Sequence, residues 1–349
     1  MLSGVLAGSS LACGTRQPTN ESPPTFRLSH RIGCNDCSGA EALSAQDIQL
    51  LRNGTVIVLN EHEPFVRVFD SAGRLVQAAG LRGEGPGELQ YPGRLFAAAD
   101  GSFRVLDAGR MEFVAYGPEG AVGESIRFST TLGVVPNGIS YDATRETLYM
   151  TGTRLGEVVP AVARFRLDGS GWESLWSGTD LPGVGTTYEV DEDGHPSHFA
   201  VAVGRGGEIA VGNGYHYRIV AFDSDGAVRS QFVRDLERRP KTAEQYEAER
   251  RRASPRWEPT PEFPHFRSTS LQFDEEGRLW VRRTDSDTPR TAFDVFHPDR
   301  GFLGPVEFDV EPIDWRMHSF EVRGGRLAMI GYDDTGNTRV WVWELRDGS

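Results

Sequence analysis

The sequence is short of positive charge, of cysteine and of long apolar runs, and each shortage argues against a class of protein. It has 349 residues, with 37 Lys plus Arg against 50 Asp plus Glu, which gives a formal net charge of −13. Nucleic-acid binding needs a surplus of clustered Lys and Arg, so nucleic acid is not expected as a partner. After the first dozen residues no apolar run approaches the roughly 18 residues that span a bilayer, which excludes a transmembrane helix there.

Glycine and proline are plentiful, and convincing helix signals are confined to one segment. The chain has 41 Gly and 20 Pro, so it is rich in turns, while 38% hydrophobic and 10% aromatic residues are too many for a disordered protein. A single helical segment does not support an α/β fold. The composition therefore predicts a globular all-β chain, and closed all-β folds of this length often form one domain.

The N-terminus resembles a bacterial lipoprotein signal. Leu2 to Ala12 is small and apolar, as in the core of a signal peptide, and it ends in Ser10-Leu11-Ala12-Cys13-Gly14. This ending resembles a lipobox, although no basic residue precedes it and Ser10 stands where Leu is usual. The resemblance implies a signal peptide over residues 1–12, lipidation of Cys13 and a tether over residues 13–25. The protein would then be exported to the periplasm or cell surface and reach the membrane only through its lipid anchor. A start codon further upstream would explain the missing basic residues, and a frayed end of a soluble protein is the alternative.

Two further cysteines lie close together in Cys34-Asn35-Asp36-Cys37. An even remainder in an exported protein predicts a disulfide between Cys34 and Cys37. So small a ring stabilises by only roughly 2 kcal/mol, which makes it a local staple. A redox role would need a helix start in a βαβ unit, and structural zinc would need a second Cys pair beside His30, Cys34 and Cys37, so neither is favoured.

A turn followed by a short alternating strand recurs six times along the chain. The second turn residue falls at positions 54, 101, 146, 207, 277 and 325, with spacings of 47, 45, 61, 70 and 48. Period-2 strands in units of about 45 residues are typical of propeller blades. The repeat predicts a six-bladed β-propeller of four-stranded antiparallel blades over residues 26–346. Closure of such a ring usually borrows a strand from the other terminus, so we expect Phe26 to Ile32 to join the blade formed by residues 315–346.

The repeats also resemble a known family. The segment Gly83-Glu84-Gly85-Pro86-Gly87-Glu88-Leu89-Gln90-Tyr91-Pro92, followed by Asp100-Gly101 and Val105-Leu106-Asp107, is similar to an NHL repeat. With Val68-Phe69-Asp70 and Glu276-Gly277-Arg278-Leu279-Trp280-Val281, the chain resembles bacterial six-bladed β-propeller proteins of the cell envelope, many of them lipoproteins of unknown function. The resemblance implies a fold and an address but no chemistry. The Gly-rich segment lacks the Gly-Lys-Ser/Thr ending of a phosphate loop, so we interpret it as a connection between blades.

Two blade spacings are long because of insertions before an inner strand, and the larger insertion runs from Arg234 to Pro264. Thr242 and Gln245 form a capping box, Glu247 and Arg251 are spaced for an i,i+4 pair, and Ser254-Pro255 ends the pattern. The sequence predicts a short helix over Thr242 to Ala253, before blade 5. It is either a solvated surface helix or a lid over the central channel.

The inner strands should reach the top face of the propeller about nine residues before each repeat mark. The top face is the one on which an outer strand connects to the next inner strand. The polar side chains near this level, with Asp47 among them, are predicted to line a ligand site: Arg94, Asn137, His198, His265, Arg267, Arg316 and His318. Arginines bind carboxylate or phosphate with two parallel hydrogen bonds, so the expected partner is a small anionic ligand, with an envelope protein as the alternative. The alternative interpretation is that these side chains line a water-filled channel that binds no ligand. We expect a monomer without a cofactor.

Catalysis is the competing class. His198, His265 and His318 lie in three successive blades, and three His with an open position can hold a catalytic zinc ion. Zinc-dependent six-bladed lyases use such a triad, and calcium-dependent lactonases share the blade number, but the three His lie at different distances from their repeat marks. No Gly-x-Ser-x-Gly motif occurs, and no catalytic residue is assigned. The sequence favours a binding or scaffolding module over a metal-dependent lyase or hydrolase.

Overall fold

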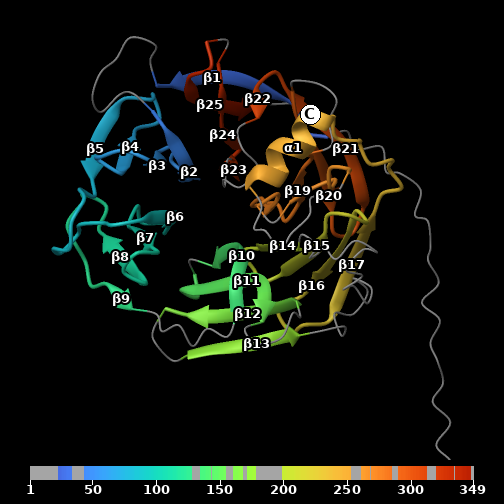
Figure 1. Ribbon diagram of the computed structural model, residues 1–349, viewed down its shortest axis with the longest axis horizontal. Coiled ribbons are helices and arrows are strands. Elements are labelled where there is room, and N and C mark those ends of the chain that lie inside the picture. The colour runs from blue at the N-terminus through green and yellow to red at the C-terminus, as the bar shows by residue number, and fades with distance from the viewer. Residues whose placement is uncertain are drawn as a thin grey trace, which may run out of the picture.

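The computed structural model describes residues 23–33, 43–127, 134–142, 144–154, 160–167, 171–177, 199–252, 261–267, 269–284, 290–312, 320–333 and 335–346. Six antiparallel sheets stand in a ring around a common axis (Figure 1). The prediction of a six-bladed β-propeller with four-stranded blades is confirmed. In the part of the chain so described, no helix is long and apolar enough to cross a membrane.

Each of the first five blades is built from four consecutive strands that pair in chain order, with the first strand innermost. Blade 1 contains β2 (Ala45–Leu50), β3 (Val56–Asn60), β4 (Val66–Phe69) and β5 (Leu75–Ala79). Blade 2 contains β6 (Pro92–Ala97), β7 (Phe103–Asp107), β8 (Glu112–Tyr116) and β9 (Ile126–Arg127). Blade 3 contains β10 (Val134–Asp142), β11 (Thr147–Arg154), β12 (Pro160–Arg166) and β13 (Gly171–Ser177).

The other blades complete the circle in the same direction (Figure 1). Blade 4 contains β14 (Phe199–Val203), β15 (Ile209–Asn213), β16 (Arg218–Phe222) and β17 (Val228–Val233). Blade 5 contains β18 (Leu271–Phe273), β19 (Leu279–Arg282), β20 (Thr291–His297) and β21 (Gly301–Phe308). Blade 6 contains β22 (Glu311–Pro312), β23 (Phe320–Arg323), β24 (Arg326–Tyr332), β25 (Thr338–Leu345) and the N-terminal β1 (Phe26–Ile32).

The repeat marks are the turns between the first two strands of blades 1 to 5 and the turn between β23 and β24 in blade 6. Gly101 has a φ of +88°, a left-handed conformation that glycine adopts without strain. Blade 3 places Glu146 at the same point with a φ of 47°. The turn therefore has the same shape in both blades, although only one of them carries the glycine that marks it in the sequence.

The core lies between neighbouring blades. Strand side chains alternate between the two faces of a sheet, so each blade packs one set against the blade before it and the other against the blade after it. Between blades 1 and 2, for example, Ile57 and Leu59 share a buried cluster with Leu95 and Val105. Each such buried side chain stabilises the fold by roughly 1.5–3 kcal/mol.

The ring closes as the sequence predicts. β1 pairs antiparallel with β25, from Phe26 opposite Leu345 to Ile32 opposite Val340, and it is the outermost strand of blade 6. One detail differs, because the blade begins at β22 rather than at residue 315. β23 covers only the Arg326 to Met329 half of β24, and the free edge at Gly331 and Tyr332 pairs with β22, which satisfies backbone groups that would otherwise be unpaired.

The insertion before blade 5 contains the helix α1 (Ala243–Arg252). The capping box is confirmed, since Gln245 N donates to Thr242 Oγ1 at 3.2 Å and Thr242 N donates to Gln245 Oε1 at 2.9 Å. Glu247 pairs with Arg250 three residues on, with Nη1 3.4 Å from Oε1, whereas Arg251 had been expected as its partner. Ala253, the predicted last residue, lies outside the described residues.

Candidate functional site

The structure describes three of the seven predicted ligand-binding side chains: Arg94, His265 and Arg267. Asn137 lies on β10, but its side chain is outside the described part of the structure. The other predicted ligand-binding residues and the three cysteines also lie outside it: Cys13, Cys34, Cys37, His198, Arg316 and His318. The predicted lipidation, disulfide and zinc triad therefore stay predictions.

Arg94 is the third residue of the innermost strand β6, near the end at which this strand starts on the top face. Its Nε lies 3.2 Å from Oδ2 of the fully buried Asp47 on β2, and its Nη2 donates to the Ile139 carbonyl on β10 at 3.3 Å. The Arg94 side chain keeps 16% of its surface exposed. One guanidinium thus bridges the innermost strands of blades 1, 2 and 3 and still reaches solvent.

Asp47 has a structural task besides facing Arg94. Its Oδ1 accepts a hydrogen bond from Ile48 N at 2.9 Å, and its Oδ2 accepts one from Leu95 N at 2.8 Å. The carboxylate is therefore shared between backbone N–H groups and the guanidinium. This arrangement fixes Arg94 in place without using all five of its N–H donors.

Three side chains that the sequence reasoning missed tie the last, first and fifth blades together around the axis. Glu321 on β23 accepts hydrogen bonds from Gln49 Nε2 on β2 at 3.0 Å and from Gln272 Nε2 on β18 at 2.5 Å. Gln272 Oε1 in turn accepts from Val322 N at 3.0 Å. A sequence signal for the two amides was present, since Gln49 and Gln272 each lie five residues before their repeat marks at 54 and 277.

His265 and Arg267 lie on the segment that leads from the insertion into β18. His265 is buried at the boundary of blades 4 and 5, where its N donates to Gly214 O at 2.9 Å and its ring lies 5.6 Å from that of Tyr217. A Cβ on Gly214 would come within 1.9 Å of the Phe266 carbonyl oxygen, so only glycine permits this approach. Arg267 is also buried, and its N donates to Ser270 Oγ at 2.9 Å. Both side chains are enclosed at the base of the insertion.

Behind His265 lies a buried polar cluster that holds blades 4 and 5 together. The Tyr217 hydroxyl donates to Asp294 Oδ2, and Arg234 Nη1 donates to Oδ1 of the same carboxylate at 2.6 Å. Burial, with the Asp294 charge beside it, raises the pKa of Tyr217. The phenol therefore remains protonated and acts as a structural donor.

The segment between β17 and α1 carries Lys241, which the sequence reasoning also missed. It is the single lysine of the chain, the other 36 of its 37 basic residues being arginines. Its Nζ lies 2.8 Å from Glu249 Oε2 on α1, and its side chain is only 1% exposed. Burial lowers the pKa of Lys241, its hydrogen bond and charge attraction with Glu249 oppose this, and the nearby Arg267 charge lowers it further.

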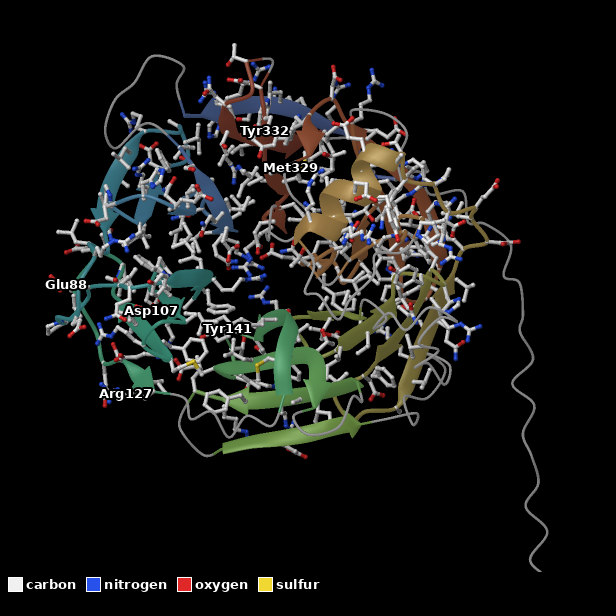
Figure 2. The ribbon with its side chains drawn as sticks, in the orientation of Figure 1. Glu88, Asp107, Arg127, Tyr141, Met329 and Tyr332 are labelled. Carbon is white, nitrogen blue, oxygen red and sulfur yellow. The ribbon has the colours of Figure 1, made fainter. Side chains whose placement is uncertain are left out.

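The Gly-rich segment Gly83 to Pro92 is held by its own chain. Asp107 accepts hydrogen bonds from Gln90 N at 2.7 Å and Tyr91 N at 3.0 Å, and Glu88 Oε2 accepts one from Gly85 N at 2.8 Å. Figure 2 shows Glu88 on the outer rim of the ring, whereas Tyr141 lies close to its centre. The segment therefore serves as a connection between blades, and carboxylates occupy its backbone donors.

A groove of about 470 Å³ opens on the outer rim between β1 and β21. Phe26, Phe308 and Trp343 line it, and the ring centroids of Phe308 and Trp343 are 4.6 Å apart. These rings fill the space between the last two blades, which diverge toward the rim of a radial array. The groove belongs to the packing of the closure and lies away from the axis.

Within the described residues no group of three or more His, Cys, Asp or Glu side chains is placed to hold a metal ion. Of the alternative zinc triad only His265 is among those residues. Its ring packs against that of Tyr217.

Comparisons with known proteins found similarity to solved structures. No family model and no curated protein matches the chain. A member of the DUF4221 family from Bacteroides vulgatus superposes with a TM-score of 0.58 at 10% identity, over 94% of this chain and 99% of that one. The virginiamycin B lyase from Staphylococcus aureus crystallised with quinupristin gives 0.47 at 10% identity, over 92% and 100% of the two chains. A luciferin-regenerating enzyme gives 0.48 at 10% identity, over 88% and 93%.

At such identities structural likeness shows the fold alone, because one fold serves many functions. The chain is a six-bladed β-propeller that resembles in fold a member of a family of unknown function.

Proposed function

We propose that this protein is an exported, lipid-anchored binding module that captures a small anionic ligand at the top face of its ring, with Arg94 as the principal contact. The single observation that carries the proposal is the position of Arg94. Its guanidinium is fixed on an innermost strand by the buried Asp47 and by the Ile139 carbonyl, and it remains partly exposed.

A guanidinium fixed in this way is suited to bind an anion. Two of its nitrogens face protein oxygens, and the fork of remaining N–H groups matches the two oxygens of a carboxylate or phosphate. Because the side chain is already ordered, a ligand would lose little of its binding energy to fixing the side-chain rotamers. The chain as a whole has a net charge of −13, so a partly exposed arginine at the axis stands out from an acidic surface.

The location of the protein in the cell is part of the proposal. Leu11-Ala12-Cys13 supports lipidation, and a tether of about a dozen residues precedes β1. A propeller held in this way would present its top face to solutes or to another protein of the envelope. Docking of an envelope protein on the top face is the alternative use of the same surface.

The test is a search for bound and bindable anions. Native mass spectrometry and elemental analysis of the purified protein would identify any co-purified small molecule or metal. A thermal-shift panel of organic acids and phosphates would then report binding, since a ligand at 100 times its Kd stabilises the fold by about 2.7 kcal/mol. The proposal predicts shifts that Arg94→Gln abolishes and that Arg74→Gln, in an exposed hairpin, preserves. Stoichiometric zinc, or no anion sensitive to Arg94, would contradict it.

A further inference from the structure

The single lysine of the chain holds a carboxylate beneath α1. Lys241 Nζ lies 2.8 Å from Glu249 Oε2, with the lysine side chain 1% and the glutamate side chain 17% exposed. Both residues belong to the insertion, eight positions apart, so the ion pair holds α1 against the segment that leads into it. Glu249 thus shows that the space beside Lys241 accepts a carboxylate.

The segment that carries Lys241 is itself held by hydrogen bonds within the insertion. Lys241 N donates to Pro261 O at 2.8 Å, and Phe263 N donates to Arg239 O at 2.9 Å. Residues 239–241 and 261–263 therefore pair like antiparallel strands. The Arg239 guanidinium lies 4.2 Å from the centre of the Phe263 ring, and Lys241 Nζ lies 5.4 Å from it. The lysine is therefore held by the paired segments at the base of the insertion, whereas Glu249 is carried by the helix.

The helix has few apolar groups with which to hold its position. Its residues are mainly charged, and Tyr246, its one large apolar side chain, is only half-buried. A helix with so small an apolar face gains little from burial, so polar contacts such as the Lys241 to Glu249 pair contribute much of its attachment. Another carboxylate or phosphate at Lys241 would compete directly with Glu249.

Arg94 and Lys241 stand on opposite sides of the axis. Arg94 belongs to blade 2, and the insertion with Lys241 leads into blade 5, which faces blade 2 in a ring of six (Figure 1). The insertion joins the outer strand β17 to the inner strand β18, so it lies at the same end of the ring as the start of β6. The top face therefore carries Arg94 on one side and, on the other, the amine of Lys241, which Glu249 covers.

We propose that the ligand carries two anionic groups, one bound by Arg94 and the other taking the place of the Glu249 carboxylate beside Lys241, with Arg267 adding positive charge beneath it. This inference rests on the proposed function and names the ligand class: an extended dianion such as a dicarboxylate or a bisphosphate. A monoanion would reach only one of the two contacts. Linking two anions makes the second contact intramolecular, which raises affinity well above that of either group alone.

The affinity test uses matched ligands. Straight-chain α,ω-dicarboxylates of four to twelve carbons and monocarboxylates of the same lengths would be titrated by calorimetry into the full-length protein. We expect one range of lengths in which the dianion binds at least tenfold more tightly than its monoanion, and Lys241→Gln should remove that advantage while leaving monoanion binding at Arg94 intact. Equal affinities of dianion and monoanion at every length would overturn the inference.

Glu249→Gln gives a second test, in which the affinity for the dianion should rise instead of fall. Loss of folding could not cause such a rise. Removing the competing carboxylate should raise the affinity for the dianion several-fold and leave that for the monoanion unchanged. Glu247→Gln is the matched control, because Glu247 lies on the same helix and pairs with Arg250 on the exposed side. Equal effects of the two substitutions would overturn the proposed competition.

The single lysine also allows a direct chemical readout. Acetylation of Lys241 by an amine-reactive ester can be followed by peptide mass spectrometry, separately from the N-terminal amine. Glu249→Gln should speed the reaction, and the dianion should slow it in that variant, because the ligand covers the amine. If monoanions bind in an Arg94-dependent way but dianions give no protection, the proposed function stands and this inference fails. If no anion binds at all, both fail.

Discussion

The side-chain amide of Gln49 donates a hydrogen bond of 3.0 Å to the carboxylate of Glu321, joining the innermost strand of the first blade to that of the last. Gln272 of blade 5 donates to the other oxygen of the same carboxylate at 2.5 Å. One buried glutamate thus connects three blades at the point where the two ends of the ring meet. Each of the two hydrogen bonds has a carboxylate as its acceptor and is therefore stronger than one between neutral groups.

Glu321→Ala should therefore destabilise the fold by about 2–4 kcal/mol, because it leaves two half-buried amides without their charged acceptor. The melting temperature should fall by several degrees. The matched control is Glu119→Ala in an exposed turn, which should melt like the wild type. A melting temperature unchanged by Glu321→Ala would show that the closure does not depend on this contact.

The closing strand makes a second prediction. β1 pairs with β25 along its length, and Ile32 is buried. Deletion of residues 1–32 should therefore expose the edge of β25. The melting temperature should fall by about 5 °C or more, as expected for a loss of several kcal/mol of stability. Deletion of residues 1–22, which leaves β1 in place, is the comparison. Equal melting temperatures for the two truncations would mean that β1 contributes no stability.

His30 should make the closure sensitive to acid. It lies on β1 against the turn at Gly73 of blade 1, where a Cβ would come within 2.9 Å of its ring. Burial lowers the pKa of His30; the Glu344 carboxylate opposes this, Arg326 adds to it, and Asp70 opposes it. The unfolded chain, with a His pKa near 6.5, therefore takes up the proton first. Stability should be lost as pH falls from about 7 through 6.5 toward the lower folded pKa.

The measurement is the melting temperature from pH 8 to pH 5 for the wild type, His30→Asn and His62→Asn. His62 is exposed and serves as the control. The slope of the wild type below pH 7 should be steeper than that of His30→Asn and equal to that of His62→Asn. Identical slopes for all three proteins would show that His30 does not cause the loss of stability at acid pH.

Lipid anchoring is tested by fractionation. With an upstream start that supplies the missing basic residues, the wild type should partition into the membrane fraction, and Cys13→Ser should leave the protein soluble, because the diacylglyceryl group attaches to the thiol. The mass of the detergent-extracted protein would identify the modification. A wild type that stays in the soluble fraction would contradict the lipoprotein hypothesis.

The fold was predictable because its signals are local and repeated. Each blade carries a turn at its mark and alternating strands on both sides of it, and a pattern that recurs six times is hard to misread. The capping box at Thr242 and the pairing of β1 with β25 followed from short-range chemistry and from the need to close a ring. The extra strand β22 was not foreseen, because it depends on how far β23 extends along β24.

The candidate site was only partly predictable, because partners come from different blades. Counting back from the repeat marks located Arg94 and Asp47, but not the pairing between them. Gln49 and Gln272 occupied matching positions, yet only the structure shows that they meet at Glu321. Lys241 lies in an insertion outside the repeat, so the period could not place it, although its being the single lysine was visible in the sequence.

The most direct test of the central claim is the affinity of wild type, Arg94→Lys and Arg94→Gln for the anion that gives the largest thermal shift, measured by calorimetry with melting curves to confirm folding. We expect a loss of affinity of about tenfold to a hundredfold for Arg94→Gln, equal to about 1.4–2.8 kcal/mol, because a charge-assisted hydrogen bond to the ligand is removed. Arg94→Lys should lose less, since it keeps the charge but not the fork. A folded Arg94→Gln protein that binds the anion as tightly as the wild type would show that Arg94 is not the ligand contact.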